Sequence, residues 1–147
     1  MTTSGFWAYG SKLSMGDGAV SEAFSDIAEI TKLSGLDMKR DTIDYTSHDS
    51  SDGYREKGPG LRDAGDVTFE GNWIPANATH NETTGLVESF NDNVNHNWKI
   101  TLPSAVATIT LVGFVSALKL GPLDVEGKGM ISGTITCSGK PGLDTTP

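Results

Sequence analysis

The chain has 147 residues, 19 of them acidic and 11 basic, and its net charge is −8 at neutral pH. This length fits one domain, and the negative charge repels nucleic acid and anionic membranes, which argues against a specific DNA-binding role. The single cysteine, Cys137, excludes an internal disulfide. The sequence shows neither a membrane-spanning apolar run nor a secretory signal, so we expect folding in a cytoplasm.

Residues 1–20 show no helical or strand period, and we interpret them as an N-terminal arm. Their large apolar side chains are Phe6, Trp7, Tyr9 and Leu13. An arm with flanking Gly5 and Gly10 does not bury such groups by itself, so we expect it to be mobile when free and to become ordered against a partner. A plain disordered terminus is the alternative.

Alternation predicts strands in the segments that follow the arm. Residues 24–33 are compatible with a strand that stops at Gly35. Residues 41–47 place Ile43 and Tyr45 on one face, which predicts a half-buried strand. Residues 66–74 are the clearest strand. Its inward side chains are Val67, Phe69 and Trp73, and its outward ones are Thr68, Glu70 and Asn72.

A stretch of about twenty residues, 47–66, separates two of these strands. It is rich in charges and glycines and is far longer than a hairpin connection needs. Its mixed charges and apolar anchors suit an interface, whereas a disordered excursion is the alternative. The candidate contact residues are Asp52, Tyr54, Arg55, Glu56, Lys57, Leu61, Arg62 and Asp63.

The second half of the chain begins with one helix and continues with strands. Residues 83–95 carry an apolar helical stripe and two possible caps: Leu86, Val87, Phe90 and Val94, with Thr83 or Thr84. Strands are expected at 95–103, 107–121 and 127–139, and the tail 141–147 is expected to be unstructured. Because strand 107–121 is apolar on both faces, we expect part of it to meet a neighbouring subunit.

No constellation in the sequence predicts catalysis, a metal or a cofactor. His48, His80 and His96 lack ligand spacing and are interpreted as loop or surface residues. Cys137 lies on an apolar strand face and is interpreted as a small core residue. We therefore expect a non-enzymatic protein without cofactors.

These elements together predict a mainly β fold. We expect an antiparallel β-sandwich or open barrel of six or seven strands with one flanking α-helix, formed by residues 21–140. Sheet edges in such a small sandwich must be blunted, covered or paired, and pairing between subunits is one solution.

Residues 27–73, "IAEITKLSGLDMKRDTIDYTSHDSSDGYREKGPGLRDAGDVTFEGNW", resemble the first half of the lambda-like phage major tail tube proteins. The segments "ITLVGFVSALKLG" and "GTITCSGKP" resemble that family's last two strands. The likeness covers about residues 12–142. It implies a sandwich whose six copies close into a ring, and rings that stack into a tube for DNA in the virion tail, assembled in the host cytoplasm.

The resemblance also implies roles for the candidate residues. The 47–66 loop would reach the neighbouring ring, and the arm would order against an adjacent subunit. A lumen that DNA crosses without specific binding should be polar or acidic, and our candidates for its lining are Asp44, Thr68, Glu70 and Asn72. Further partners would be the tape measure, tail tip and terminator proteins.

Two other functions remain compatible with the sequence. One is a tube protein of a contractile injection or secretion system, which shares the ring architecture. The other is a monomeric ligand-binding sandwich that uses exposed aromatics such as Trp73 and Trp98, although their alternation with apolar residues favours burial.

Overall fold

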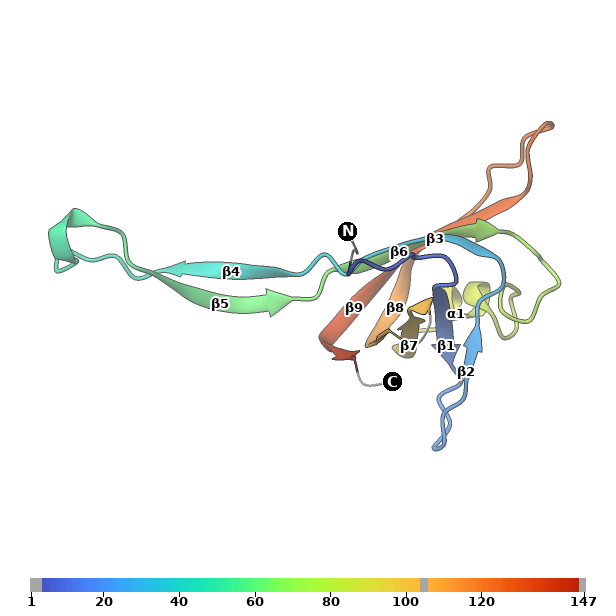
Figure 1. Ribbon diagram of the computed structural model, residues 1–147, viewed down its shortest axis with the longest axis horizontal. Helices are drawn as coiled ribbons and strands as arrows, with labels where there is room; N and C mark the ends of the chain where they lie inside the picture. The colour runs from blue at the N-terminus through green and yellow to red at the C-terminus, as the bar shows by residue number, and fades with distance from the viewer. Residues whose placement is uncertain (1–3, 104–105, 146–147) are drawn as a thin grey trace.

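The computed structural model describes residues 4–103 and 106–145, and its secondary structure is mainly β (Figure 1). The elements are β1 (Lys12–Gly16), β2 (Phe24–Asp26), β3 (Ile30–Ser34), β4 (Lys39–Asp44), a 3₁₀ turn (Ser51–Gly53), β5 (Lys57–Asp63), β6 (Asp66–Asn72), α1 (Leu86–Asn91), β7 (His96–Thr101), β8 (Thr108–Leu120) and β9 (Met130–Asp144). Across the described ranges, no helix has the length and apolarity to cross a membrane. The predicted mainly β class with one helix is confirmed.

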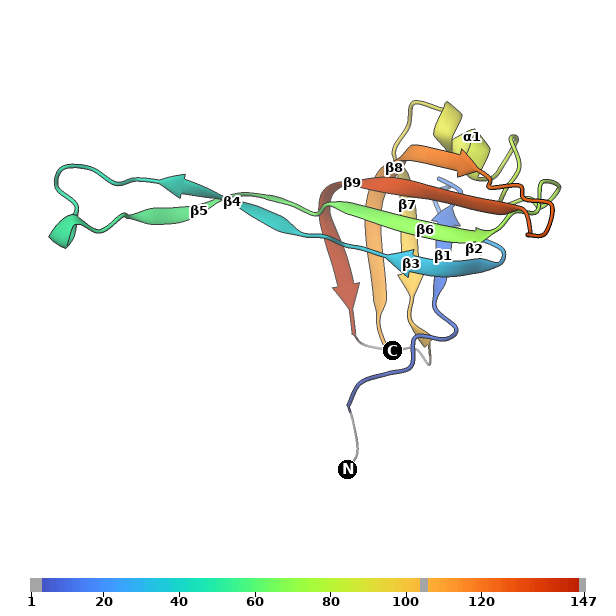
Figure 2. The same cartoon turned by 90° about the horizontal axis from the view of Figure 1, so that it is seen from above.

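Seven strands form one antiparallel sheet in the order β2-β1-β7-β8-β9-β6-β3, which folds over itself (Figure 2). The long strands β8 and β9 bend and belong to both layers. In β9 the bend lies at residues 139–141, where Gly139 has a φ of 81°. On either side of this bend, Ser138 pairs with Val112 of β8 and Gly142 pairs with Thr110. The sheet stays open between β2 and β3, so the predicted sandwich or open barrel is confirmed.

The core lies between the two layers. Val67 and Phe69 of β6 point inward as predicted, and so do Trp98 and Ile100 of β7. The Trp98 indole N–H donates to the Gly113 carbonyl at 3.1 Å. Trp98 is fully buried, and Trp73, just beyond β6, is partly buried against the same core. These positions argue against an aromatic ligand platform.

The first correction concerns the N-terminal arm. The sequence predicts no strand in residues 1–20, but β1 begins at Lys12 and pairs with β7. Leu13, expected to contact another subunit, is fully buried. Leu13 and Met15 lie opposite Ile100 and Trp98, so this two-residue alternation is too short to recognise without its partner strand.

The second correction concerns the segment after β3. Residues 47–66 are not an irregular loop, because β5 pairs with β4 in a two-stranded hairpin that projects from the body (Figure 1). The half-buried strand expected at 41–47 begins at Lys39 and is exposed along its length. The alternation of Ile43 and Tyr45 is typical of a core face, but no layer of this chain covers it.

The third correction concerns the C-terminal tail. The sequence predicts that residues 141–147 are unstructured, but β9 continues to Asp144 and pairs again with the start of β8. Gly142 lies opposite Thr110, and Leu143 lies opposite Ile109. Pro141 and the glycines suggest an end to the strand, whereas they form its bend. Residues 146–147 lie outside the described range.

The helix is shorter than the predicted 83–95. Gly85 is its N-cap and no side chain caps it, so neither threonine has that role. Its buried residues are Leu86 and Ser89, whereas Phe90 and Val94 of the predicted stripe are exposed. A helix this short buries about one side chain in each turn, so Phe90 and Val94 remain exposed.

His80, interpreted from the sequence as a surface or loop residue, is fully buried. Its Nε2–H donates to the Ala28 carbonyl at 2.8 Å, and its Nδ1 accepts from the Ile74 N–H at 3.0 Å. The imidazole therefore ties the turn before α1 to the segment between β2 and β3.

Replacing this imidazole should destabilise the fold. We expect His80→Ala to lower the free energy of unfolding by about 1–3 kcal/mol, because it leaves a buried carbonyl and a buried N–H without partners. Urea unfolding of the free subunit measures this loss. His48→Ala, in the exposed hairpin tip, is the matched control and should unfold like the wild type. Equal stability of both variants would contradict the bridging role.

Candidate assembly surfaces

The projecting β4–β5 hairpin contains all eight residues predicted for the long loop. Asp52 lies in the 3₁₀ turn at the tip with a φ of 56°, and the adjoining Tyr54 is 75 % exposed. Leu61 is 84 % exposed on β5. A hairpin with such exposed apolar side chains, held away from its own core, is typical of an element that contacts another molecule.

Polar bonds within the hairpin fix its tip. Arg55 forms an ion pair with Asp44 at 3.1 Å, and the Glu56 N–H donates to the Thr46 hydroxyl at 2.8 Å. Hydrogen bonds from Thr46 hold the pKa of the Asp44 carboxyl below its usual value, and Arg55 lowers it further. Glu56 also accepts from the Ser50 hydroxyl. Arg55 and Glu56, predicted to pair across an interface, thus already have partners inside the hairpin.

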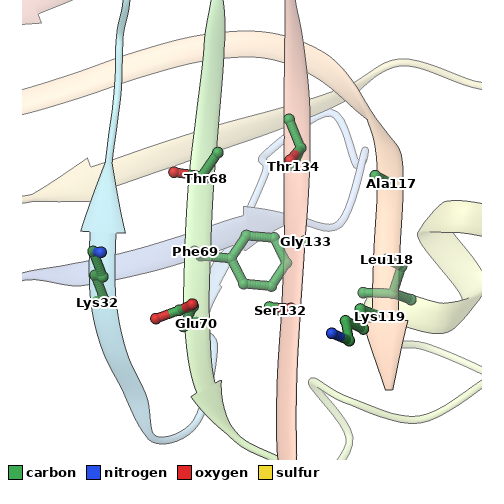
Figure 3. Close-up of a pocket in the computed structure, with 10 residues that line it drawn as sticks. All are labelled: Lys32, Thr68, Phe69, Glu70, Ala117, Leu118, Lys119, Ser132, Gly133 and Thr134. Atoms are coloured by element: carbon green, nitrogen blue, oxygen red, sulfur yellow. The ribbon is translucent and has the colours of Figure 1, made fainter. Parts of the chain in front are cut away.

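The candidate lumen residues separate into two places. Thr68 and Glu70 lie together on the outer face of β6, and Figure 3 shows them among the residues that line a shallow depression over β3, β6, β9 and β8. Asn72 ends the strand and donates to Glu29 at 3.1 Å. Asp44 lies on the hairpin, in the separate two-stranded sheet.

The outer face around this depression is rich in hydroxyls and balanced in charge. One row crosses the sheet from Lys32 through Glu70 and Ser132 to Lys119, each opposite the next. Thr134 is also in this depression, and the Thr136 hydroxyl donates to Ser116 at 2.8 Å. The face is therefore polar without the acidic excess of the whole chain.

Beneath the depression, Phe69 lies against Gly133 of β9 (Figure 3). A Cβ at position 133 would come within 2.8 Å of the ring, so glycine is required for this close packing. The Phe69 ring therefore packs against Gly133 on the core side of this layer, whose opposite face is the polar one.

The N-terminal segment before β1 carries exposed aromatics. Trp7 and Tyr9 stack on each other with ring centroids 5.1 Å apart, and they are 80 % and 76 % exposed. Phe6 is half exposed. Three of the four predicted arm residues are therefore available for contact, and Leu13 is not.

Strand β8 presents a further surface that the sequence pattern also indicates. Leu111 and Val115 are buried, whereas Val112 and Phe114 on the opposite face are more than 40 % exposed. β7 begins at His96 opposite Gly113, so residues 114–120 have a paired strand, β9, on one side only. Strand β8 is thus apolar on both faces, but this chain covers only the face that carries Leu111 and Val115.

Residues that sequence reasoning missed line a groove at the base of the hairpin. Met38, Arg40 and Lys140 meet there although Lys140 is a hundred residues from the other two. Local patterns carry no signal for this juxtaposition, since it depends on the bend in β9.

No group of three or more His, Cys, Asp or Glu side chains in the described ranges could hold a metal ion. Burial raises the pKa of the Cys137 thiol, which keeps it protonated and poorly nucleophilic at neutral pH. Exposed apolar strands, a projecting hairpin and open sheet edges are typical of a subunit of a larger assembly.

The comparisons with known proteins agree with this class. Residues 7–144 match the family model described as lambda phage tail tube protein. The chain belongs to this family and is thus a tail tube protein, a structural component of the tail of phage or phage-like particles. No curated protein sequence matches it at a significant level.

Chains from solved tail-like particles share the fold at low sequence identity. A chain of the sheath–tube complex of an extracellular contractile injection system has a TM-score of 0.73 and 19 % identity, covering 97 % of this chain and 93 % of that one. A chain of the anti-feeding prophage cap has 0.73 and 20 %, covering 99 % and 95 %. A chain of the tail of an empty gene transfer agent particle has 0.64 and 20 %, covering 92 % and 96 %.

Proposed function

We propose that the chain is the repeating subunit of a siphophage tail tube, in which six copies close into a ring and stacked rings form the conduit for genome delivery. The observation that carries this proposal is a body with two open sheet edges and a hairpin that projects away from it (Figure 1). The gene transfer agent tail that shares the fold was refined with C6 symmetry. Sixfold closure is therefore the arrangement we carry over to this chain.

Ring closure would use the two open edges of one layer. β3 pairs with β6 alone, and the second half of β8 pairs with β9 alone. Joining β3 of one copy to β8 of the next satisfies the unpaired backbone groups of both edges. Repetition of this heterologous contact closes a ring. The neighbouring copy would then also cover part of Val112 and Phe114, which are exposed in the single chain.

The polar outer face of this layer would then line the lumen. Thr68 and Glu70 belong to it, whereas Asp44 lies on the hairpin and would face the lumen only if the hairpin did. Lys32 and Lys119 balance Glu70 and Asp66, and most other positions carry hydroxyls. The apolar side chains of this face include Ala117 opposite Thr134 and Phe114 opposite Thr136. Such a face gives phosphates few lasting cation contacts, so double-stranded DNA would pass without specific binding.

The hairpin and the N-terminal aromatics would hold the rings together. The hairpin reaches beyond its own body, and Phe6, Trp7 and Tyr9 are exposed in the free subunit. Burial of these side chains against an adjacent copy would offset the entropy of ordering the arm. At its ends the tube would meet the tape measure, tail tip and terminator proteins.

Electron microscopy of the purified protein tests this function. We expect rings with sixfold symmetry, or hollow tubes built from them, at raised protein concentration. Size-exclusion chromatography on the same sample should show a concentration-dependent shift away from the 15.5 kDa subunit. A subunit that stays monomeric at every concentration and salt condition would refute the proposal.

A tube of a contractile injection system is the second candidate. One solved chain with a TM-score of 0.73 belongs to the sheath–tube complex of an extracellular contractile injection system. This function requires an outer surface that binds a sheath. Purified tubes should then bind the sheath protein encoded by the same genome, and the lack of a sheath gene beside this one would exclude it.

A further inference from the structure

The groove at the base of the hairpin is unusually cationic for this chain. It lies where β4 and β5 leave the body, beside the bend of β9. Its lining contains four of the eleven basic residues of the chain and one acid: Lys39, Arg40, Arg62 and Lys140, with Asp63. None of these four cations forms an ion pair with a described residue.

Apolar side chains border the same cations. Met38 is 67 % exposed and Leu61 is 84 % exposed, and Pro141 of the β9 bend lies beside them. An open groove that combines uncovered apolar groups with unpaired cations fits an apolar and acidic segment of a partner.

The loop between β8 and β9, residues 121–129, has this complementary character. Leu123 and Val125 are exposed, Val125 completely, and they alternate with Asp124 and Glu126. Lys128 near the end of the loop leaves it a net negative charge. Neither acid forms an ion pair within the described residues.

The loop and the groove lie at opposite ends of the body. Both views show the hairpin leaving one end and the 121–129 loop projecting from the other (Figures 1 and 2). The loop of one copy therefore does not reach its own groove. In a head-to-tail stack of identical copies, however, one end of each body faces the opposite end of the next, and such a heterologous contact repeats without limit.

We propose that the 121–129 loop of one copy docks in the hairpin-base groove of the next copy. Val125 and Leu123 cover Met38 and Leu61, and the acids of the loop lie among the arginines and lysines. This contact rests on the proposed stacking of rings, and it names the receptor surface on which one copy meets the next.

Disulfide trapping tests the contact in assembled tubes. In a Cys137→Ala background, Val125→Cys is combined in turn with Met38→Cys, Leu61→Cys or Lys140→Cys, and tubes seen by electron microscopy are mildly oxidised. A covalent ladder of many subunits should form for at least one pair, because each copy carries both halves of the contact. Val125→Cys alone should give no ladder.

The matched control replaces Val125→Cys by Val20→Cys, which is equally exposed on the loop between β1 and β2. Tubes that give no ladder with any of the three pairs, or ladders just as strong with Val20→Cys, would overturn the docking. If the wild type forms no tubes at all, the proposed function fails, which is a different result.

A charge exchange gives a second measurement. Arg62→Glu should lower the temperature at which tubes dissociate, and Arg62→Glu/Glu126→Lys in one chain should recover most of that loss. The control Arg62→Glu/Glu82→Lys has the same net charge but alters an acid outside the loop, and it should recover nothing. Equal recovery by both double variants would contradict the contact.

Discussion

Subunits in which residues 45–56 are replaced by an Asn-Gly turn will fold and close into rings but will not stack into tubes. Asp44 and Lys57 are directly paired at the point where the tip begins, so a two-residue turn joins them without changing the register of β4 and β5. The variant removes the whole tip, including Tyr54 and Arg55, and keeps the body intact.

The expected effect is large because every subunit of a ring loses its projecting contact at the same time. Electron microscopy and sedimentation measure it as the loss of tubes at concentrations where the wild type assembles. Circular dichroism and thermal unfolding of the free subunit should match the wild type and thus show that the fold is retained. Tubes of normal length and heat stability would refute the stacking role of the hairpin.

Trp98→Ala should destabilise the free subunit more than His80→Ala does. The Trp98 side chain is fully buried between the layers and its N–H is bonded to Gly113. Truncation of a buried Trp costs about 3–5 kcal/mol through lost burial and the cavity that remains. Much of the stability of a domain of this size would disappear, since such domains are stable by only about 5–15 kcal/mol.

Urea unfolding of the free subunit checks this prediction, with Trp7→Ala as the matched control. Trp7 is 80 % exposed, so its truncation should change the free energy of unfolding by less than about 0.5 kcal/mol. If the two tryptophan variants unfold at the same urea concentration, the position assigned to Trp98 in the core is wrong.

The core strands could be predicted from the sequence because each shows its own alternation. Val67 and Phe69, or Trp98 and Ile100, mark a buried face within a few residues. The hairpin could not be predicted in this way, since Ile43 and Tyr45 alternate without a core to face. The continuation of β9 through Pro141 could not be predicted either, because it depends on pairing with Thr108–Thr110, more than thirty residues earlier.

The candidate contact residues also differ in whether they are close together in the sequence. Those of the hairpin are contiguous in sequence, so composition alone could single out Tyr54 and Leu61. The groove at its base unites Met38, Arg62 and Lys140, and its position is fixed only by how the sheet bends. Surfaces assembled from distant segments leave no local pattern.

The bend shared by β8 and β9 has a mechanical consequence. Their ladder from Val112–Ser138 to Leu120–Ile131 continues past the corner to Thr108–Asp144, so the same pair of strands runs through both layers. A pull along these strands must break many hydrogen bonds at once, in shear, rather than peel them one by one. Sliding β8 along β9 in one layer would therefore also disrupt their pairing in the other layer.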